Sequence, residues 1–176
     1  MIITSTFIAT FLAAAVIFVS YRGRGRGANQ AVVDDEKSDW TMADWKTDAG
    51  PIVLQFRNQK PDDHRARYDT AVVVEWEYGH QGFPDQETMD RIYRLQHAME
   101  AVTAAQVGIL VHTLMGAGVR EWCYYTNDYA TFEARFNEVC KDLPLMPIEL
   151  SFQKDSEWKY WQSMKLLPEG GGSANE

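Results

Sequence analysis

Apolar residues along the chain fall into blocks of two different spacings, separated by turn-forming residues. The most regular block, Val107 to Tyr125, consists of two runs rich in β-branched and aromatic residues, joined by Met115-Gly116-Ala117-Gly118. Two such runs around a glycine-containing turn predict a β-hairpin. We expect this hairpin to form the centre of a sheet.

Three further regions carry strand patterns. Thr70 to Trp76 is almost continuously apolar, which is typical of a strand covered on both faces. Met146 to Phe152 predicts another strand. Trp40 to Trp45 and Ile52 to Arg57 flank the turn residues Asp48-Ala49-Gly50-Pro51, and this arrangement predicts an additional N-terminal hairpin.

Two segments repeat apolar residues at helical spacing. The first can be capped by Asp85 and runs to about Ala104. Its apolar stripe contains Met89, Ile92, Leu95 or Gln96, Met99 and Val102. The second is capped by Asn127 or Asp128 and ended by Pro144. Its apolar face contains Phe132, Phe136, Val139, Cys140 and Leu143.

The order of these elements predicts the fold class. From Thr70 to Phe152 the order is strand, helix, strand, strand, helix, strand, which is the β-α-β-β-α-β core of an α+β, ferredoxin-like fold. We expect both helices to cover one face of the sheet. Asp155 can cap a short C-terminal helix, whose Trp158-Tyr160-Trp161 aromatics would cover the edge or the open face of the sheet.

The N-terminal region has a different character. Residues 2–20 carry no charge and are long enough to cross a bilayer of about 30 Å as a helix. The basic residues Arg22, Arg24 and Arg26 follow, and we interpret them as membrane-interface residues that contact anionic head groups. A cleaved signal peptide would need basic residues before the apolar run, and none precedes Ile2. The RGRGRG run is also an RNA-binding pattern, but no aromatic residue is interleaved with it.

Basic residues are absent before the apolar segment, whereas three arginines follow it. Because basic residues stay on the cytoplasmic side, this distribution predicts a single-pass protein of a bacterial inner membrane with a cytoplasmic C-terminal domain. The expected organisation is a transmembrane helix (1–21), a basic-then-acidic linker (22–38), an α+β domain (39–168) and a flexible tail (169–176).

The charge of the domain excludes one class of partner. Residues 34–176 hold all 25 acidic residues against 14 basic ones, a net charge of −11. Nucleic-acid phosphates would be repelled by this domain, so we expect no nucleic-acid partner.

Residues that could carry chemistry are scattered. Cys123 and Cys140 form no metal-binding or disulfide framework, and two free thiols fit a reducing compartment. The four histidines show no metal-ligand spacing, and His112, between apolar neighbours, is expected to be a buried imidazole with its hydrogen bonds satisfied. Glu75 and Glu77 share one face of a strand, which we interpret as a solvated face on an edge. We therefore predict no catalytic residues, no metal and no cofactor.

The aromatic residues are the most informative feature. They gather in the second strand of the central hairpin and in the C-terminal segment, and tyrosine and tryptophan dominate interface hot spots. The candidate partner-binding residues are Arg120, Trp122, Tyr124, Trp158, Tyr160 and Trp161. For at least half of these aromatic residues, core packing is the interpretation that we favour.

The chain resembles the bacterial domain-of-unknown-function family 695. The resemblance rests on the run from Gly118 to Tyr125, the helix with Asp128 and Phe132, Pro147, and Asp155-Ser156-Glu157-Trp158 with Tyr160. Ser156 stands where the family more commonly has proline. The resemblance covers about Trp40 to Leu167 and implies no catalytic residues, because no activity is established for the family. The architecture is also similar to that of the regulator of ribonuclease E activity B family, small acidic proteins that bind and inhibit an enzyme, which suggests a class of function by analogy of fold.

Three hypotheses for function follow. The first is a non-catalytic protein-binding or regulatory module on the cytoplasmic face of the membrane, with an unknown protein partner. The second is an enzyme or small-ligand-binding protein with a site formed by Arg120, Glu121, Tyr124 and Trp158 on the open sheet face. The third is a periplasm-facing, immunity-like protein, which requires the opposite topology.

Overall fold

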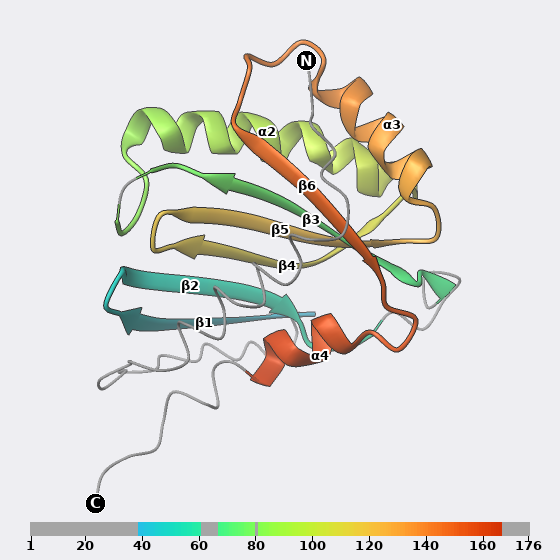
Figure 1. Cartoon of the computed structure of the whole chain (residues 1–176), viewed down its shortest axis with the longest axis horizontal. Helices are drawn as coiled ribbons and strands as arrows, with labels where there is room; N and C mark the ends of the chain where they lie inside the picture. Colours follow the sequence, from blue (N-terminus) through green and yellow to red (C-terminus); the bar gives the residue numbers. More distant parts are fainter. Residues whose placement is uncertain (1–38, 61–66, 80, 167–176) are drawn as a thin grey trace, which may run out of the picture.

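The chain folds into an α+β domain built on a six-stranded antiparallel sheet (Figure 1). The computed structural model describes residues 39–60, 67–79 and 81–166. The strands are β1 (Trp40–Thr47), β2 (Gly50–Arg57), β3 (Thr70–Glu77), β4 (Ile109–Gly116), β5 (Val119–Thr126) and β6 (Ile148–Lys154). The helices within these ranges are α2 (Gln86–Ala104), α3 (Tyr129–Cys140) and α4 (Lys159–Leu166).

The strands are arranged in the order β1-β2-β4-β5-β3-β6, and every neighbouring pair is antiparallel. The β4–β5 hairpin therefore lies in the middle of the sheet, as its sequence predicts. Ala117 and Gly118 form its turn with φ angles of 52° and 87°. Positive φ at both central positions suits the right-handed twist of the two strands, and glycine adopts it without steric cost.

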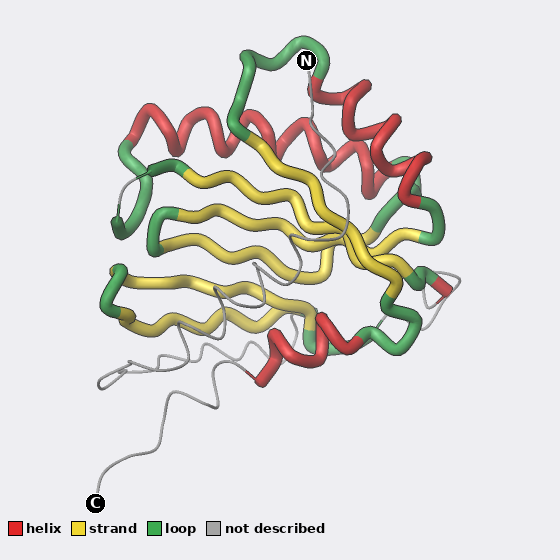
Figure 2. Tube along the Cα trace, in the orientation of Figure 1, coloured by secondary structure: helices red, strands yellow, loops and turns green. Residues whose placement is uncertain are grey.

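Helices α2 and α3 cover one face of the sheet, as expected, and lie together beside β3 and β6 (Figures 1 and 2). Asp85 caps α2 by accepting a hydrogen bond from the Thr88 amide at 2.8 Å, and Asp128 caps α3 through the Ala130 amide at 3.1 Å. The predicted stripe of α2 is confirmed. Its buried members are Ile92, Leu95, Met99 and Val102. Helix α3 ends at Cys140, one turn before the predicted end at Pro144.

Helix α4 covers part of the opposite face, near the end of β2 (Figure 1). The Trp158 ring stacks on Tyr125 with 4.0 Å between ring centroids, and its Nε1 donates to the Tyr68 carbonyl at 2.8 Å. Trp161 Nε1 donates to the Arg57 carbonyl at 3.1 Å. Strand β3 is consequently packed on both faces, with Val72 and Val74 against the helices and Val73 in the cluster beneath α4.

Several boundaries differ from the sequence prediction. The N-terminal hairpin is longer than expected: its turn contains only Asp48 and Ala49, and Pro51 pairs with Lys46 within the ladder. Strand β6 begins at Ile148 rather than Met146, because Pro147 has no amide hydrogen to donate to a neighbouring strand.

The predicted membrane anchor at residues 2–20, the interface residues Arg22, Arg24 and Arg26, and the tail at 169–176 lie outside the described residues. Among the helices of the described ranges, none combines the length and apolarity that a bilayer span requires.

Candidate functional site

Three glutamates form a row across the face of the sheet that also carries α4. Glu75 on β3 lies directly opposite Glu121 on β5 and directly opposite Glu149 on β6. Directly opposed side chains in an antiparallel pair lie about 5 Å apart at Cβ, and like charges in such positions are unfavourable. We call Glu75, Glu121 and Glu149 the acidic row.

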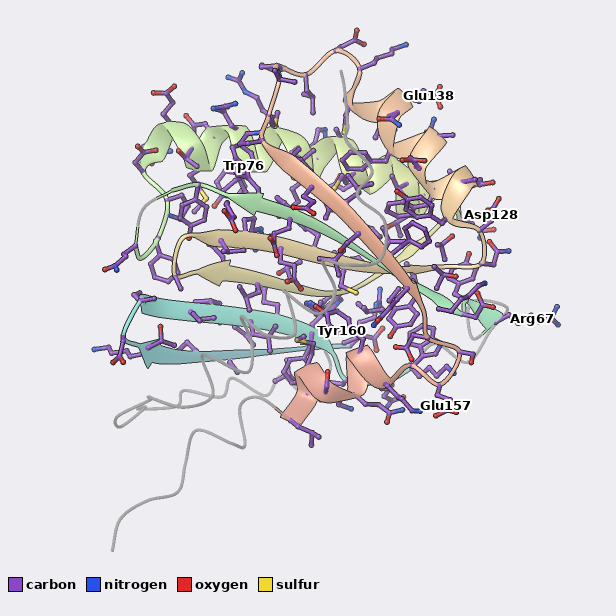
Figure 3. The ribbon with its side chains drawn as sticks, in the orientation of Figure 1. Arg67, Trp76, Asp128, Glu138, Glu157 and Tyr160 are labelled. Carbon is purple, nitrogen blue, oxygen red and sulfur yellow. The ribbon has the colours of Figure 1, made fainter. Side chains whose placement is uncertain are left out.

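One end of the acidic row is buried beneath α4. His112 is fully buried, Glu121 is 2% exposed, and His112 Nε2 lies 2.5 Å from Glu121 Oε1. Tyr160 of α4, labelled in Figure 3, donates its hydroxyl to the same Oε1 at 3.2 Å. His112 Nδ1 is enclosed and finds no hydrogen-bond partner among the described residues. The expected buried imidazole is thus present, with one of its two nitrogens paired.

A β-bulge aligns His112 with this face. The β4–β5 register shifts between Leu110 and His112, so that His112 lies opposite Cys123. Without the shift, simple alternation along β4 would place His112 on the helix side together with Leu110. Because bulges leave no clear signature in a single sequence, the pairing of His112 with Glu121 was not predictable.

Glu75 occupies the middle of the acidic row and is half-buried. Burial, and to a lesser extent the neighbouring carboxylates Glu121, Glu77 and Glu149, together raise the pKa of Glu75 to about 7. Its carboxylate makes no hydrogen bond or ion pair with any described residue. The sequence interpretation of a solvated edge is corrected here: β3 lies between β5 and β6, so only Glu77, at its end, is exposed.

Asp155 fixes α4 against the sheet and so positions Tyr160. Its carboxylate accepts hydrogen bonds from the Lys159 and Tyr160 amides, both at 2.8 Å, and from the Tyr125 hydroxyl at 2.5 Å. These contacts confirm the expected capping role. Burial and the hydrogen bond to Asp155 raise the pKa of Tyr125, so its hydroxyl remains a donor at neutral pH.

The predicted partner-binding residues are divided between the two faces. Arg120, Trp122 and Tyr124 lie on the helix side with exposures of 8%, 0% and 3%. Trp158 and Trp161 are buried beneath α4 at 0% and 8%. Tyr160 is half-buried and contacts the acidic row. The alternative site formed by Arg120, Glu121, Tyr124 and Trp158 is not assembled, because Arg120 and Tyr124 point away from Glu121 and Trp158.

Neither metal binding nor thiol chemistry is indicated for this site. Among the described residues no group of three or more His, Cys, Asp or Glu side chains is arranged to hold a metal ion. Cys123 and Cys140 are both buried free thiols. Burial raises the pKa of each thiol, to about 11 for Cys140, so neither is an activated nucleophile.

The fold and this site define an α+β domain with a row of three glutamates on the face that carries its short C-terminal helix. Residues 38–164 match the family model described as a family of unknown function (DUF695), and the chain belongs to this family. The comparison with curated proteins found no match.

Proposed function

We propose that the domain is a non-catalytic protein-binding module in which the acidic row accepts a basic segment of a partner protein. The observation that carries this proposal is that Glu75 is half-buried beside two other glutamates. A half-buried carboxylate with two directly opposed glutamates and no cationic partner among the described residues is electrostatically unfavourable. A lysine or arginine from a partner would relieve that repulsion.

The surroundings of the acidic row support a protein partner. Ser151 and Gln153 follow Glu149 at alternate positions along β6, an edge strand, and extend the row into a partly exposed polar surface. Tyr160 adds an aromatic side chain at the other end. An acidic surface on a domain of net charge −11 would also steer a basic partner toward it.

The core topology supports a regulatory analogy. The order β6-β3-β5-β4, with α2 between β3 and β4 and α3 between β5 and β6, fits a ferredoxin-like core to which β1 and β2 are added. Small acidic ferredoxin-like proteins that bind and inhibit an enzyme are the precedent for this class of function. The precedent is an analogy of fold.

The proposed location is the cytoplasmic face of a bacterial inner membrane. Its support is the uncharged segment 2–20 followed by Arg22, Arg24 and Arg26. Reporters that are active on only one side of the membrane, fused after Glu176, test this orientation. Activity of the periplasmic reporter would instead favour the periplasm-facing, immunity-like protein.

A second candidate function is acid–base catalysis or small-ligand binding at the acidic row. It is favoured by the pKa of about 7 for Glu75, because a general base works best when its pKa is near the working pH. If this candidate is right, a small cationic ligand should shift the NMR signals of the acidic-row side chains in the absence of any protein partner. The protein-binding proposal does not predict such a shift, so this measurement separates the two candidates.

Photo-crosslinking tests the main proposal. A photoreactive amino acid replaces Ser151, which lies on the same face of β6 as Glu149. The control position is Glu87, exposed on α2 on the opposite side of the sheet. We expect the Ser151 variant to capture a protein through a lysine- or arginine-containing segment. Crosslinks obtained only from position 87, or from neither position, would contradict the proposal.

A further inference from the structure

Arg120 lies on the helix side of the sheet, facing away from the acidic row. It is 8% exposed, and its Nη2 donates to Gln96 Oε1 on α2 at 2.7 Å. The guanidinium carbon lies 4.7 Å from the centre of the Trp122 ring. Arg120 is therefore held in a fixed position by one side-chain amide and one aromatic face.

Arg120 forms no ion pair with a carboxylate in the described part of the chain, and its Nε is enclosed without a hydrogen-bond partner. Glu121, the next residue on β5, acts on Arg120 electrostatically but points to the opposite face of the sheet. Arginine is almost never buried unless paired, because removing the guanidinium from water is costly. Burial lowers the pKa of Arg120 to about 10, which still leaves it charged at neutral pH. An uncompensated, pre-positioned cation of this kind is suited to an incoming anion.

The groups around Arg120 are hydrogen-bond donors. The Gln96 oxygen is already used, because it accepts from Arg120 and from Trp122 Nε1 at 3.4 Å. Its amide NH2 group is thus left to donate. Tyr93 precedes Gln96 by three residues on α2, is 58% exposed, and is close enough to Arg120 to influence its pKa.

A ligand can approach from the β4 side. Met115, directly opposite Arg120 on β4, is only half-buried. The remaining guanidinium nitrogen, Nη1, neither bonds to a described residue nor is enclosed. The guanidinium therefore keeps an accessible edge beside α2.

From this arrangement we infer that Arg120, Gln96 and Tyr93 form a binding site for an oxyanion, a carboxylate or phosphate group carried by a ligand. Arg120 supplies the charge and a planar pair of donors, and Gln96 and Tyr93 supply neutral donors. The site lies on the opposite face of the sheet from the acidic row, so it is independent of the proposed partner surface.

The side-chain Nε–H signals of arginine provide a direct test. The full chain, labelled with ¹⁵N-arginine and held in a maltoside detergent, is titrated with inorganic phosphate or acetate at constant ionic strength. The Arg120 signal is assigned by its loss in Arg120→Lys. We expect this signal to shift along a saturating curve, whereas the signal of exposed Arg94 on α2 does not saturate.

Substitutions of the neutral donors complete the test. Gln96→Ala and Tyr93→Phe should each weaken binding by about fivefold, the effect of one lost hydrogen bond, whereas Gln86→Ala on α2 should not. If the Arg120 signal saturates at a lower concentration of phosphate than of acetate, the site prefers a phosphate group. If it saturates at a lower concentration of acetate, the site prefers a carboxylate. An Arg120 signal that responds to neither anion, or only as Arg94 does, would overturn the inference.

Discussion

Glu75 and Glu121 lie directly opposite each other on adjacent strands, and no cationic side chain of the described residues lies between them. Only Glu121 is stabilised locally, by His112 and Tyr160. The repulsion is therefore concentrated on Glu75, whose pKa is raised to about 7. This relationship makes the stability of the domain depend on pH.

The free energy of unfolding should fall as the pH rises through the window from about 4.5 to about 7, because Glu75 holds its proton more tightly in the folded chain than in the unfolded one. Glu75→Gln removes this contribution, so the variant should gain stability relative to the wild type at pH 8 and lose most of that advantage at pH 5. Urea unfolding followed by tryptophan fluorescence measures the difference.

Glu87→Gln is the control, because Glu87 is exposed on α2, on the opposite side of the sheet from Glu75. It also replaces one glutamate by glutamine and should leave the pH slope close to that of the wild type. If the unfolding free energy of the wild type and of Glu75→Gln changed equally with pH, the result would contradict the burial of an unpaired carboxylate at position 75.

The His112–Glu121 pair should be sensitive to removal of one partner. His112→Phe leaves the carboxylate of Glu121 buried without its closest neighbour, and we expect a loss of about 3–5 kcal/mol in unfolding free energy. Tyr160→Phe removes the longer hydrogen bond to Glu121, and a loss of about 1 kcal/mol in unfolding free energy is expected. Chemical denaturation measures both losses. Equal losses of unfolding free energy for His112→Phe and Tyr160→Phe would show that the His112–Glu121 contact is not the main interaction that stabilises Glu121.

Asp155 should be essential for the position of α4. Asp155→Ala removes the acceptor for two helix amides and leaves the buried Tyr125 hydroxyl without a carboxylate, with an expected cost of about 3 kcal/mol. The exposed neighbour Ser156 is the control, and Ser156→Ala should change stability by less than about 0.5 kcal/mol. Amide hydrogen exchange should localise the Asp155→Ala effect to α4.

Gly116 should tolerate no side chain. A Cβ at this position would lie 2.0 Å from the Pro51 carbonyl oxygen of β2, and its φ of +136° is unfavourable for other residues. Gly116→Ala should cost at least about 2 kcal/mol, by thermal unfolding, because the two backbones would have to separate. Gly79→Ala, at a positive φ with no atom within 4 Å of the added Cβ, should cost only about 1 kcal/mol.

Much of the architecture follows from local patterns in the sequence. The apolar spacing of α2, the capping residues Asp85 and Asp128, and the glycine-containing turn before β5 each give a local signal, and each prediction is confirmed. The predicted ends of strands and helices were less accurate. At β6, for example, the proline at 147 delays pairing until Ile148.

The acidic row was not predictable from one sequence. Glu75 and Glu149 are separated by more than 70 residues, and only the strand order and register bring them opposite each other. A related limit holds for the aromatic residues. Core packing is expected for at least half of them, but only the folded structure shows that Trp122 and Trp158 fill the two cores on either side of β5.

The most direct test of the central claim is the affinity of the full chain for a short, fluorescently labelled lysine-rich peptide, measured by anisotropy at pH 8. The double variant Glu75→Gln/Glu149→Gln should bind about tenfold more weakly than the wild type, equivalent to about 1.4 kcal/mol. The double variant Glu87→Gln/Asp142→Asn, which removes two exposed acids elsewhere, should bind like the wild type. Equal losses of affinity in both double variants would show that net charge, and not the acidic row, recognises the basic segment.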